Sequence, residues 1–194
     1  IRNRILVEDV PSALQHLTDI LEAMRENRVL EIEYHPFYLE ESQHIQLLPY
    51  FVKLYERRWY VYGPTQENRQ IKVYALDRVQ RLSISGQTFR MPKGFSAEEH
   101  LATSIGIAYP DIPPRRIVIK CTGEQPQYLR ALPLHHSQEE TEQHDGWSLF
   151  GYYLAPTNEF SENIAPREFM EIFSPEEVRQ EYAAILEKML GQHR

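Results

Sequence analysis

The hydrophobic pattern of the first part of the chain predicts one amphipathic helix followed by several short strands. Apolar residues recur at helical spacing from Leu14 to Met24, and Pro11 and Ser12 are typical of a helix start, so we expect a helix that ends near Asn27. Shorter apolar runs separated by polar stretches then predict strands at 29–34, 45–54, 59–62, 70–76 and 79–84. Because strands with hydrophobic inner faces would otherwise leave exposed edges, we predict a small five-stranded barrel.

The pattern changes between residues 88 and 114, where proline and glycine interrupt regular structure. The interrupting residues are Pro92, Gly94, Gly106, Pro110, Pro113 and Pro114. Within this stretch we expect one short helix over 96–102, with Ser96 as its N-cap and Glu99 completing a capping box. The predicted organisation is therefore a first domain at 11–90, a linker at 91–114 and a second domain at 115–194.

In the second domain, the sequence pattern predicts the order strand, helix, strand, strand, helix, strand, helix. Its expected elements cover 116–121, 124–131, 138–143, 147–154, 158–165, 168–173 and a last helix that starts at 174–177. Asp145-Gly146 favours a tight hairpin turn, and Ser174 as N-cap with Pro175 at the first position is typical of a helix start. We expect a compact α+β sandwich.

The composition indicates an ordinary soluble protein with few signals of catalysis. Hydrophobic residues make up 42% and charged residues 25% of the 194 positions. Without a long apolar run or a signal-peptide core, we expect a cytoplasmic protein that contacts no membrane. The single Cys121 excludes an internal disulfide framework and is expected to be buried in a strand. No phosphate loop, nucleophile elbow or zinc-protease motif occurs, so we expect no enzymatic activity and no cofactor.

Histidines do not predict a metal site. The pair His135-His136 lies not far from His144 in the sequence. Adjacent residues on a strand point to opposite faces, however, and cannot readily bind one metal ion together. We therefore expect no metal.

The start of the chain and its charge both bear on DNA binding. Residues 1–10 begin with Ile1 rather than Met and show no helix or strand period, so we expect a linker from a missing N-terminal domain. The net charge is −7, whereas gripping duplex DNA requires a basic face. Any binding of duplex DNA is expected to belong to the missing part.

Cations and aromatic residues alternate along two of the predicted strands. The two stretches are Arg57-Arg58-Trp59-Tyr60-Val61-Tyr62-Gly63 and Lys72-Val73-Tyr74-Ala75-Leu76-Asp77-Arg78-Val79. Alternation places one set of side chains on a shared face of a sheet. Guanidinium and ammonium groups beside aromatic rings suit a flat, anionic ligand, and nucleotides fit that description best.

Eight residues are candidates for ligand binding: Arg78, Arg58, Lys53, Lys72, Tyr60, Tyr74, Tyr34 and Trp59. Arg78 suits a phosphate or carboxylate clamp, and the alternative is a structural salt bridge to Asp77 or a nearby glutamate. Arg69 lies in a polar turn and is expected to face solvent.

Four further candidates also have two interpretations. Arg58 and Lys53 either contact the ligand or are solvated cations at the rim of a hairpin. Tyr60 and Tyr34 either stack on a base or close the barrel. For Trp59, filling the core is the expected role.

Three motifs give the first domain a resemblance to the WYL domain. They are Leu48-Pro49-Tyr50-Phe51-Val52-Lys53, Arg58-Trp59-Tyr60-Val61 and Tyr74-Ala75-Leu76-Asp77-Arg78-Val79, in the expected order after Ile32-Glu33-Tyr34. Residues 115–194 resemble the C-terminal extension of WYL-type transcriptional regulators. The resemblance implies a Sm-like or SH3-like five-stranded barrel that senses a nucleotide or single-stranded nucleic acid. It also implies an upstream winged helix-turn-helix and a homodimer formed through the extension.

Two positions depart from the family pattern. Val61 stands where leucine is usual, which exchanges one core residue for another, and Ala75 stands where many relatives carry a basic residue. Lys72 and Lys53 are expected to supply compensating charge. The leading hypothesis is a ligand-sensing, dimerising region of a DNA-binding regulator, and the alternative is a single-stranded nucleic-acid binding module that acts directly.

Overall fold

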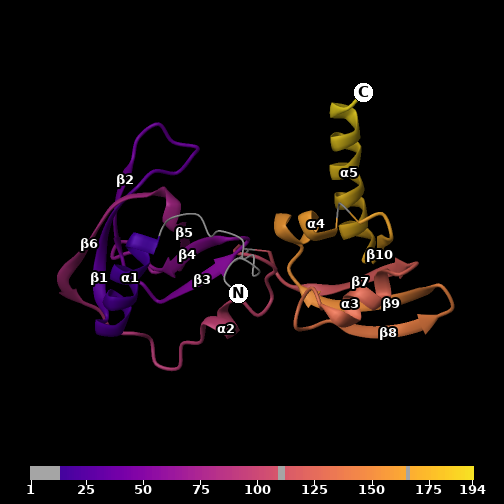
Figure 1. The fold of residues 1–194 in the computed structure, drawn as a ribbon, viewed down its shortest axis with the longest axis horizontal. Coiled ribbons are helices and arrows are strands. Elements are labelled where there is room, and N and C mark those ends of the chain that lie inside the picture. The colour runs from indigo at the N-terminus through magenta and orange to yellow at the C-terminus, as the bar shows by residue number, and fades with distance from the viewer. Residues whose placement is uncertain (1–13, 109–111, 165–166) are drawn as a thin grey trace, which may run out of the picture. The chain divides into compact units, whose positions relative to one another are not determined.

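The chain divides into two compact units, residues 1–97 and 98–194, each with its own hydrophobic core. The computed structural model describes residues 14–108, 112–164 and 167–194 (Figure 1). Several predictions lie outside the described residues: the linker at 1–10, the helix start at Pro11 and Ser12, Pro110, and the end of a helix at Ala165. Helix α2 (Ala97–His100) falls at the division and is shorter than the predicted 96–102.

Over its described residues, 14–97, the first unit contains helix α1 and six strands. Helix α1 (Leu14–Glu26) confirms the predicted amphipathic helix and packs on strands β1 and β6. The strands are β1 (Arg28–Tyr34), β2 (Gln43–Leu47), β3 (Phe51–Tyr55), β4 (Arg58–Gly63), β5 (Lys72–Ala75) and β6 (Val79–Thr88). The 3-10 turn η2 (Leu76–Arg78) connects β5 to β6.

These strands form two antiparallel sheets, and the described residues do not form the closed five-stranded barrel that we predicted. One sheet has the order β2-β1-β6 and the other the order β3-β4-β5. An isolated bridge between Leu47 and Thr65 joins them, with a hydrogen bond of 2.9 Å from the Leu48 N–H to the Pro64 carbonyl. The prediction of one strand at 45–54 was wrong, because the chain passes from the first sheet to the second at 48–50.

The core of the first unit lies between α1 and the two sheets. Ile20, Leu30, Leu47 and Leu76 are fully buried there. On the other face of β3 and β4, the Phe51 and Tyr62 rings stack with 4.3 Å between centroids.

The second unit confirms the predicted order of elements. It contains β7 (Arg115–Thr122), α3 (Gln125–Ala131), β8 (Glu139–His144), β9 (Trp147–Leu154), α4 (Asn158–Ile164), β10 (Met170–Ser174) and α5 (Glu176–Gln192). The strands pair antiparallel in the order β10-β7-β9-β8, which is a split β-α-β arrangement. Gly146 has φ of 80° in the turn between β8 and β9, as the predicted Asp-Gly hairpin requires.

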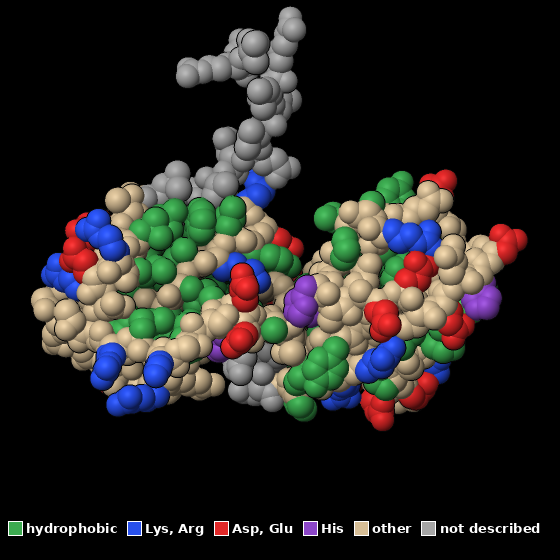
Figure 2. Space-filling view, turned by 90° about the horizontal axis from the view of Figure 1, so that it is seen from below, with side chains coloured by type: hydrophobic (Ala, Val, Ile, Leu, Met, Phe, Trp, Pro, Cys, Tyr) green, Lys and Arg blue, Asp and Glu red, His purple; other side chains and the backbone are tan. Residues whose placement is uncertain are grey.

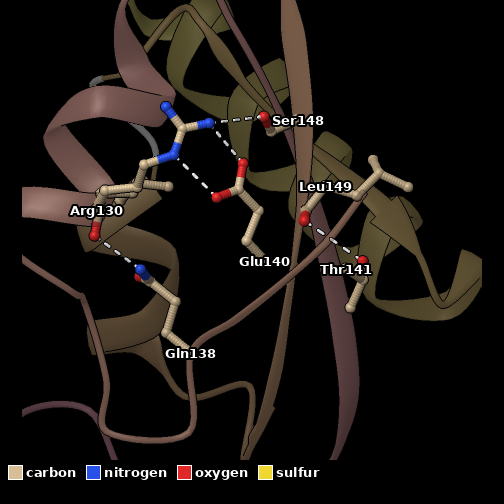
Figure 3. Close-up of polar contacts among 7 residues, drawn as sticks. Arg130, Gln138, Glu140, Thr141, Ser148 and Leu149 are labelled. Carbon is tan, nitrogen blue, oxygen red and sulfur yellow. Dashed lines mark hydrogen bonds and ion pairs between the residues drawn. The ribbon is translucent and has the colours of Figure 1, made fainter. Parts of the chain in front are cut away.

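A polar cluster fixes helix α3 to the sheet (Figure 3). The Arg130 guanidinium donates two hydrogen bonds to the Glu140 carboxylate, of 2.9 and 2.6 Å, and a third of 3.3 Å to the Ser148 hydroxyl. Hydrogen bonding to Arg130 lowers the pKa of Glu140. The Gln138 amide donates to the Leu129 carbonyl at 2.7 Å, so the loop after α3 is tied back to the helix.

Two details of the second unit differ from prediction. Helix α5 has Pro175, not Ser174, as its N-cap residue. His135 and His136 lie between α3 and β8 rather than on a strand, with 4.2 Å between ring centroids. Among the described residues, no group of three His, Cys, Asp or Glu side chains is arranged to hold a metal ion.

None of the described helices is both long and apolar enough to cross a membrane. In the space-filling view, hydrophobic side chains gather over the first unit, whereas acidic and basic side chains are interspersed over the second (Figure 2).

Candidate ligand-binding site

Strand register divides the predicted ligand-binding residues between two faces of the sheet β3-β4-β5. Lys53 lies opposite Tyr60 across β3 and β4, and Tyr60 lies opposite Ala75 across β4 and β5. Because successive side chains alternate along a strand, Lys53, Arg58 and Tyr60 share one face. Trp59, Tyr74 and Lys72 therefore belong to the opposite face. The eight candidates do not form the single surface that alternation alone suggested.

Three of the candidate aromatic residues belong to the core region. Trp59 is half-buried and packs against the core of the first unit, as expected. Tyr34 and Tyr74 are buried and meet edge to face, with 5.2 Å between ring centroids. The backbone N–H of Ala75 donates to the Tyr34 hydroxyl at 3.3 Å. Since Tyr34 is on β1 and Tyr74 is on β5, this contact holds the two sheets together.

Burial has a direct electrostatic consequence for one of these phenols. Loss of solvation, with smaller contributions from Tyr34 and Tyr38, raises the pKa of Tyr74 to about 12. Burial therefore favours the neutral form of this phenol. Tyr34 and Tyr74 support the site rather than present a free ring to a ligand.

The turn between β3 and β4 presents two cations at the rim of the sheet. Glu56 and Arg57 occupy this turn with φ of 45° and 63°, the geometry of a two-residue hairpin with both central residues left-handed. Glu56, Arg57, Arg58 and Tyr60 line a hollow of about 350 Å³. Tyr60 is 8% exposed, so it forms the floor of the hollow while the arginines form its rim.

Arg58 is anchored by the turn that precedes β6. Its guanidinium lies 3.3 Å from the Asp77 carboxylate, and the two side chains are 40% and 26% exposed. Asp77 directly precedes Arg78 in η2. The pair therefore links the hairpin rim to the turn that carries Arg78, and it occupies the carboxylate that we had considered as a partner for Arg78.

Arg78 makes a contact that the sequence did not reveal. Its guanidinium carbon lies 4.0 Å from the centroid of the Phe37 ring, although Phe37 is 71% exposed. The Arg78 Nε is buried and has no hydrogen-bond partner among the described residues. Phe37 comes from the loop between β1 and β2, which is tied to Arg78 by a hydrogen bond of 3.0 Å from the His35 N–H to the Arg78 carbonyl.

Phe37 and its neighbour are the functional candidates that sequence reasoning missed. Tyr38 is 81% exposed, so the loop displays two aromatic rings in succession. The available signal was an uninterrupted run of apolar residues, Phe37-Tyr38-Leu39, in a connection that should otherwise be polar.

Lys72 lies in a different depression, at the seam between the two sheets. This depression has a volume of about 680 Å³ and is lined by Gln43, His44, Ile45, Gln46, Thr65, Gln66, Glu67, Asn68, Lys72 and Tyr74. Its carboxamide side chains can both donate and accept hydrogen bonds, which suits the edge of a nucleobase.

Comparison with known families identifies the first unit. Residues 15–84 match the model of the WYL domain, from α1 to within β6. This part of the chain is a WYL domain. A search of curated protein sequences found no match.

Two solved structures resemble most of the chain, including its WYL domain. A structure described as a CRISPR Cas-related protein matches with a TM-score of 0.57 at 14% identity, over 93% of this chain and 52% of that one. Proteasome accessory factor B/C (PafBC) of Arthrobacter aurescens matches with a TM-score of 0.43 at 17% identity, over 91% of this chain and 28% of that one. The chain thus spans about half the length of the first structure and less of the second. At 14% identity the likeness to the CRISPR Cas-related structure concerns the fold alone.

The two departures from the WYL pattern have distinct structural settings. Val61 is 1% exposed and belongs to the core, so it replaces one apolar core residue by another. Ala75 lies beside Tyr60, whose other neighbour across the sheet is Lys53. Lys53 therefore shares the face of Ala75, whereas Lys72 belongs to the opposite face. Of the two lysines expected to compensate, only Lys53 is placed to do so.

Proposed function

We propose that this chain is the ligand-sensing and dimerising region of a WYL-type DNA-binding transcription regulator, and that its effector is a nucleotide or a nucleic-acid-like anion. The observation that carries the proposal is the group of cations and aromatic rings at one end of the WYL domain. Arg58 and Tyr60 line one hollow, Asp77 joins Arg58 to the η2 turn, and Arg78 in that turn stacks with Phe37.

The chemistry of this group favours a planar, anionic effector. An arginine guanidinium offers a flat fork of donors to a phosphate, and an exposed aromatic ring offers a stacking surface to a base. The Nε–H of Arg78 is buried and makes no hydrogen bond to the described residues, so it can donate to an acceptor atom of the effector. A flat base stacked on Phe37, with its phosphate at Arg78 or Arg58, would use both kinds of group.

Regulation would follow from coupling between this site and an interface between two chains. We place duplex-DNA binding in a domain outside this chain, a proposal in keeping with its net charge of −7. Dimerisation is assigned to the second unit, where α5 exposes Ile185, Leu186, Met189 and Leu190 on neighbouring turns. An effector that favours one dimer arrangement would bias DNA binding by a coupling free energy of about 1–3 kcal/mol. The role needs no catalytic step.

A second candidate function is direct binding of single-stranded nucleic acid, with the WYL domain as a stacking platform. The exposed rings of Phe37 and Tyr38 favour it, because successive bases can stack on neighbouring rings. The two functions differ in how affinity depends on ligand length. A nucleotide sensor saturates with one small ligand, whereas a strand binder gains affinity with each added nucleotide until its surface is filled.

The test is fluorescence-anisotropy binding of labelled DNA and RNA oligonucleotides of increasing length, with unlabelled mono- and dinucleotides as competitors. Full competition by a small nucleotide, with a shallow dependence on salt, supports the sensor. Affinity that rises with length and falls steeply with salt supports the strand binder. If neither a nucleotide nor an oligonucleotide binds, the proposed effector class is wrong.

A further inference from the structure

A second group of cations on the first unit lines a concavity that shares no lining residue with the two hollows described above. Tyr50, Arg69, Arg90, Met91, Pro92 and Lys93 line an open concavity of about 740 Å³. Its lining contains three cations and no carboxylate. This is unexpected in a chain that carries 28 acidic and 21 basic residues.

The cations come from two segments that are distant in sequence, and hydrogen bonds brace both segments. Next to Arg69, the Asn68 N–H donates to the Thr65 hydroxyl and the Thr65 N–H donates to the Asn68 carbonyl, both at 2.9 Å. On the other side, the Phe89 N–H donates to the Asn27 carbonyl at 2.8 Å. The site is therefore formed by the fold and not by one run of basic residues.

Aromatic rings support this concavity. Tyr50 stacks with Phe89 at 5.8 Å between centroids and meets Phe95 edge to face at 5.1 Å. Burial raises the pKa of Tyr50 in spite of the opposing charge of Arg69, which favours the protonated hydroxyl. A phenol donor beside arginines adds a further group that can bind a phosphate oxygen.

Within the described part of the chain, the three cations of this concavity, Arg69, Arg90 and Lys93, have no acidic partner in an ion pair. Like charges gathered around one concavity repel one another, and a bound anion would relieve that repulsion. The volume lies within the range of small-molecule sites and is far larger than an inorganic phosphate needs.

We propose that this concavity is a second anion site, which binds the phosphate groups of a nucleotide, either free or as part of a strand. Arg69 and Arg90 supply planar donor forks for phosphate oxygens, and Lys93 supplies a mobile point charge. This concavity includes neither Arg58 nor Arg78, so it stands independently of the function proposed above. Arg69, which we expected only to face solvent, is therefore proposed to bind phosphate.

The test follows backbone amide resonances of the ¹⁵N-labelled chain during titration with AMP, with (dT)₄ and with (dT)₁₂. It is run on the wild type and on the double variant Arg58→Gln, Arg78→Gln. We expect saturable shifts at the amides of 69, 90, 91 and 93 in both proteins. Saturation by AMP identifies a free nucleotide as sufficient, and shifts that require (dT)₁₂ identify a strand.

Charge-removing variants give a second, quantitative measurement. The triple variant Arg69→Gln, Arg90→Gln, Lys93→Gln is expected to lower the salt slope of (dT)₁₂ binding by about 2, since each phosphate contact on a single strand contributes about 0.7. The charge-matched control is Arg25→Gln, Arg81→Gln, Lys188→Gln at exposed positions, and it should leave the slope nearly unchanged.

Two results would overturn the second site. One is the absence of saturable shifts at 69 and 90–93 with all three probes, whatever happens near Arg58 and Arg78. The other is a triple variant whose affinity and salt slope equal those of the charge-matched control. The site at Arg58 and Arg78 is tested separately. It is wrong if the double variant binds every probe as tightly as the wild type does.

Discussion

The guanidinium of Arg58 lies 3.3 Å from the carboxylate of Asp77, so a strand residue and a turn residue share one ion pair at the rim of the WYL domain. This pair brings the cation of β4 to the turn that also carries Arg78. It also places a negative charge beside the proposed effector site, where it partly neutralises Arg58.

Removing that carboxylate should therefore strengthen the binding of anions. We expect Asp77→Asn to raise the affinity for a labelled oligonucleotide about two- to five-fold, because Arg58 is released to the ligand. Unfolding free energy should fall by less than about 1 kcal/mol, since both side chains are partly exposed. The control is Glu33→Gln, which removes the partner of the exposed Arg81. Equal effects of the two variants in anisotropy would show that only net charge matters.

The chain is packed so closely around Gly63 that any larger side chain there should destabilise the protein. A Cβ atom there would lie 1.8 Å from the Leu48 carbonyl oxygen, so the backbone must move to accommodate it. We expect Gly63→Ala to lower the free energy of unfolding by about 3 kcal/mol in urea denaturation. In Gly86→Ala the added Cβ meets no atom within 4 Å, and stability should change by less than about 1 kcal/mol. Similar urea midpoints for the two variants would contradict the close packing of Gly63 against Leu48.

The only cysteine should be unreactive in the folded protein. Cys121 is fully buried, and burial raises the pKa of its thiol from 9.0 to about 12. At pH 8 we expect modification by a disulfide reagent to be at least about 100-fold slower than in denaturant, because the thiolate is both scarce and inaccessible.

The same shift has a consequence for stability at high pH. Because the folded pKa lies above the unfolded value, the contribution of Cys121 to stability is complete below about pH 9 and is lost as pH rises toward 12. Cys121→Ser should weaken the pH dependence of unfolding in that window.

The labelling experiment also has a contradicting outcome. Rapid modification of Cys121 in the native protein at pH 8 would show that this strand is not packed as described.

The distal part of α5 predicts a dimer interface that can be broken without unfolding the monomer. Leu186 and Met189 are 39% and 47% exposed, so a charge there costs little in an isolated chain. We expect Leu186→Glu to convert a dimer to a monomer in light scattering after size exclusion, with no loss of secondary structure. Glu187→Gln serves as the control on the same turn. A wild type that is monomeric at all accessible concentrations would contradict the assignment of dimerisation to this unit.

Local patterning predicted the elements well but not how the strands of the first unit are distributed between sheets. The apolar run at 45–54 predicted one strand, whereas the structure contains β2 and β3 with a break at 48–50. Pro49 has no N–H, and its neighbours make their hydrogen bonds elsewhere: Leu48 donates to Pro64, and Tyr50 donates to Tyr62 at 2.8 Å. These partners are distant in sequence, so no local pattern could identify them. In the second unit the hairpin and helix signals were sufficient, and the order of elements was correct.

The same distinction holds for the candidate site. Sequence identified Arg58, Tyr60 and Arg78, but strand register and turn geometry decide which of them lie near one another. The contact between Phe37 and Arg78 depends on a loop closing onto η2, and Arg69 and Arg90 line one concavity although they come from two loops. Such contacts follow from tertiary structure and have no periodic signature.

The central claim is that an anionic nucleotide or strand binds at Arg78 and its Phe37 partner. The most direct measurement is the anisotropy titration of one labelled oligonucleotide with the wild type, Arg78→Ala and Arg81→Ala, where Arg81 is a cation on β6 with an 87% exposed side chain. The account predicts saturable binding that weakens at least about ten-fold in Arg78→Ala and changes less than about two-fold in Arg81→Ala. Equal affinities for the wild type and Arg78→Ala would contradict it.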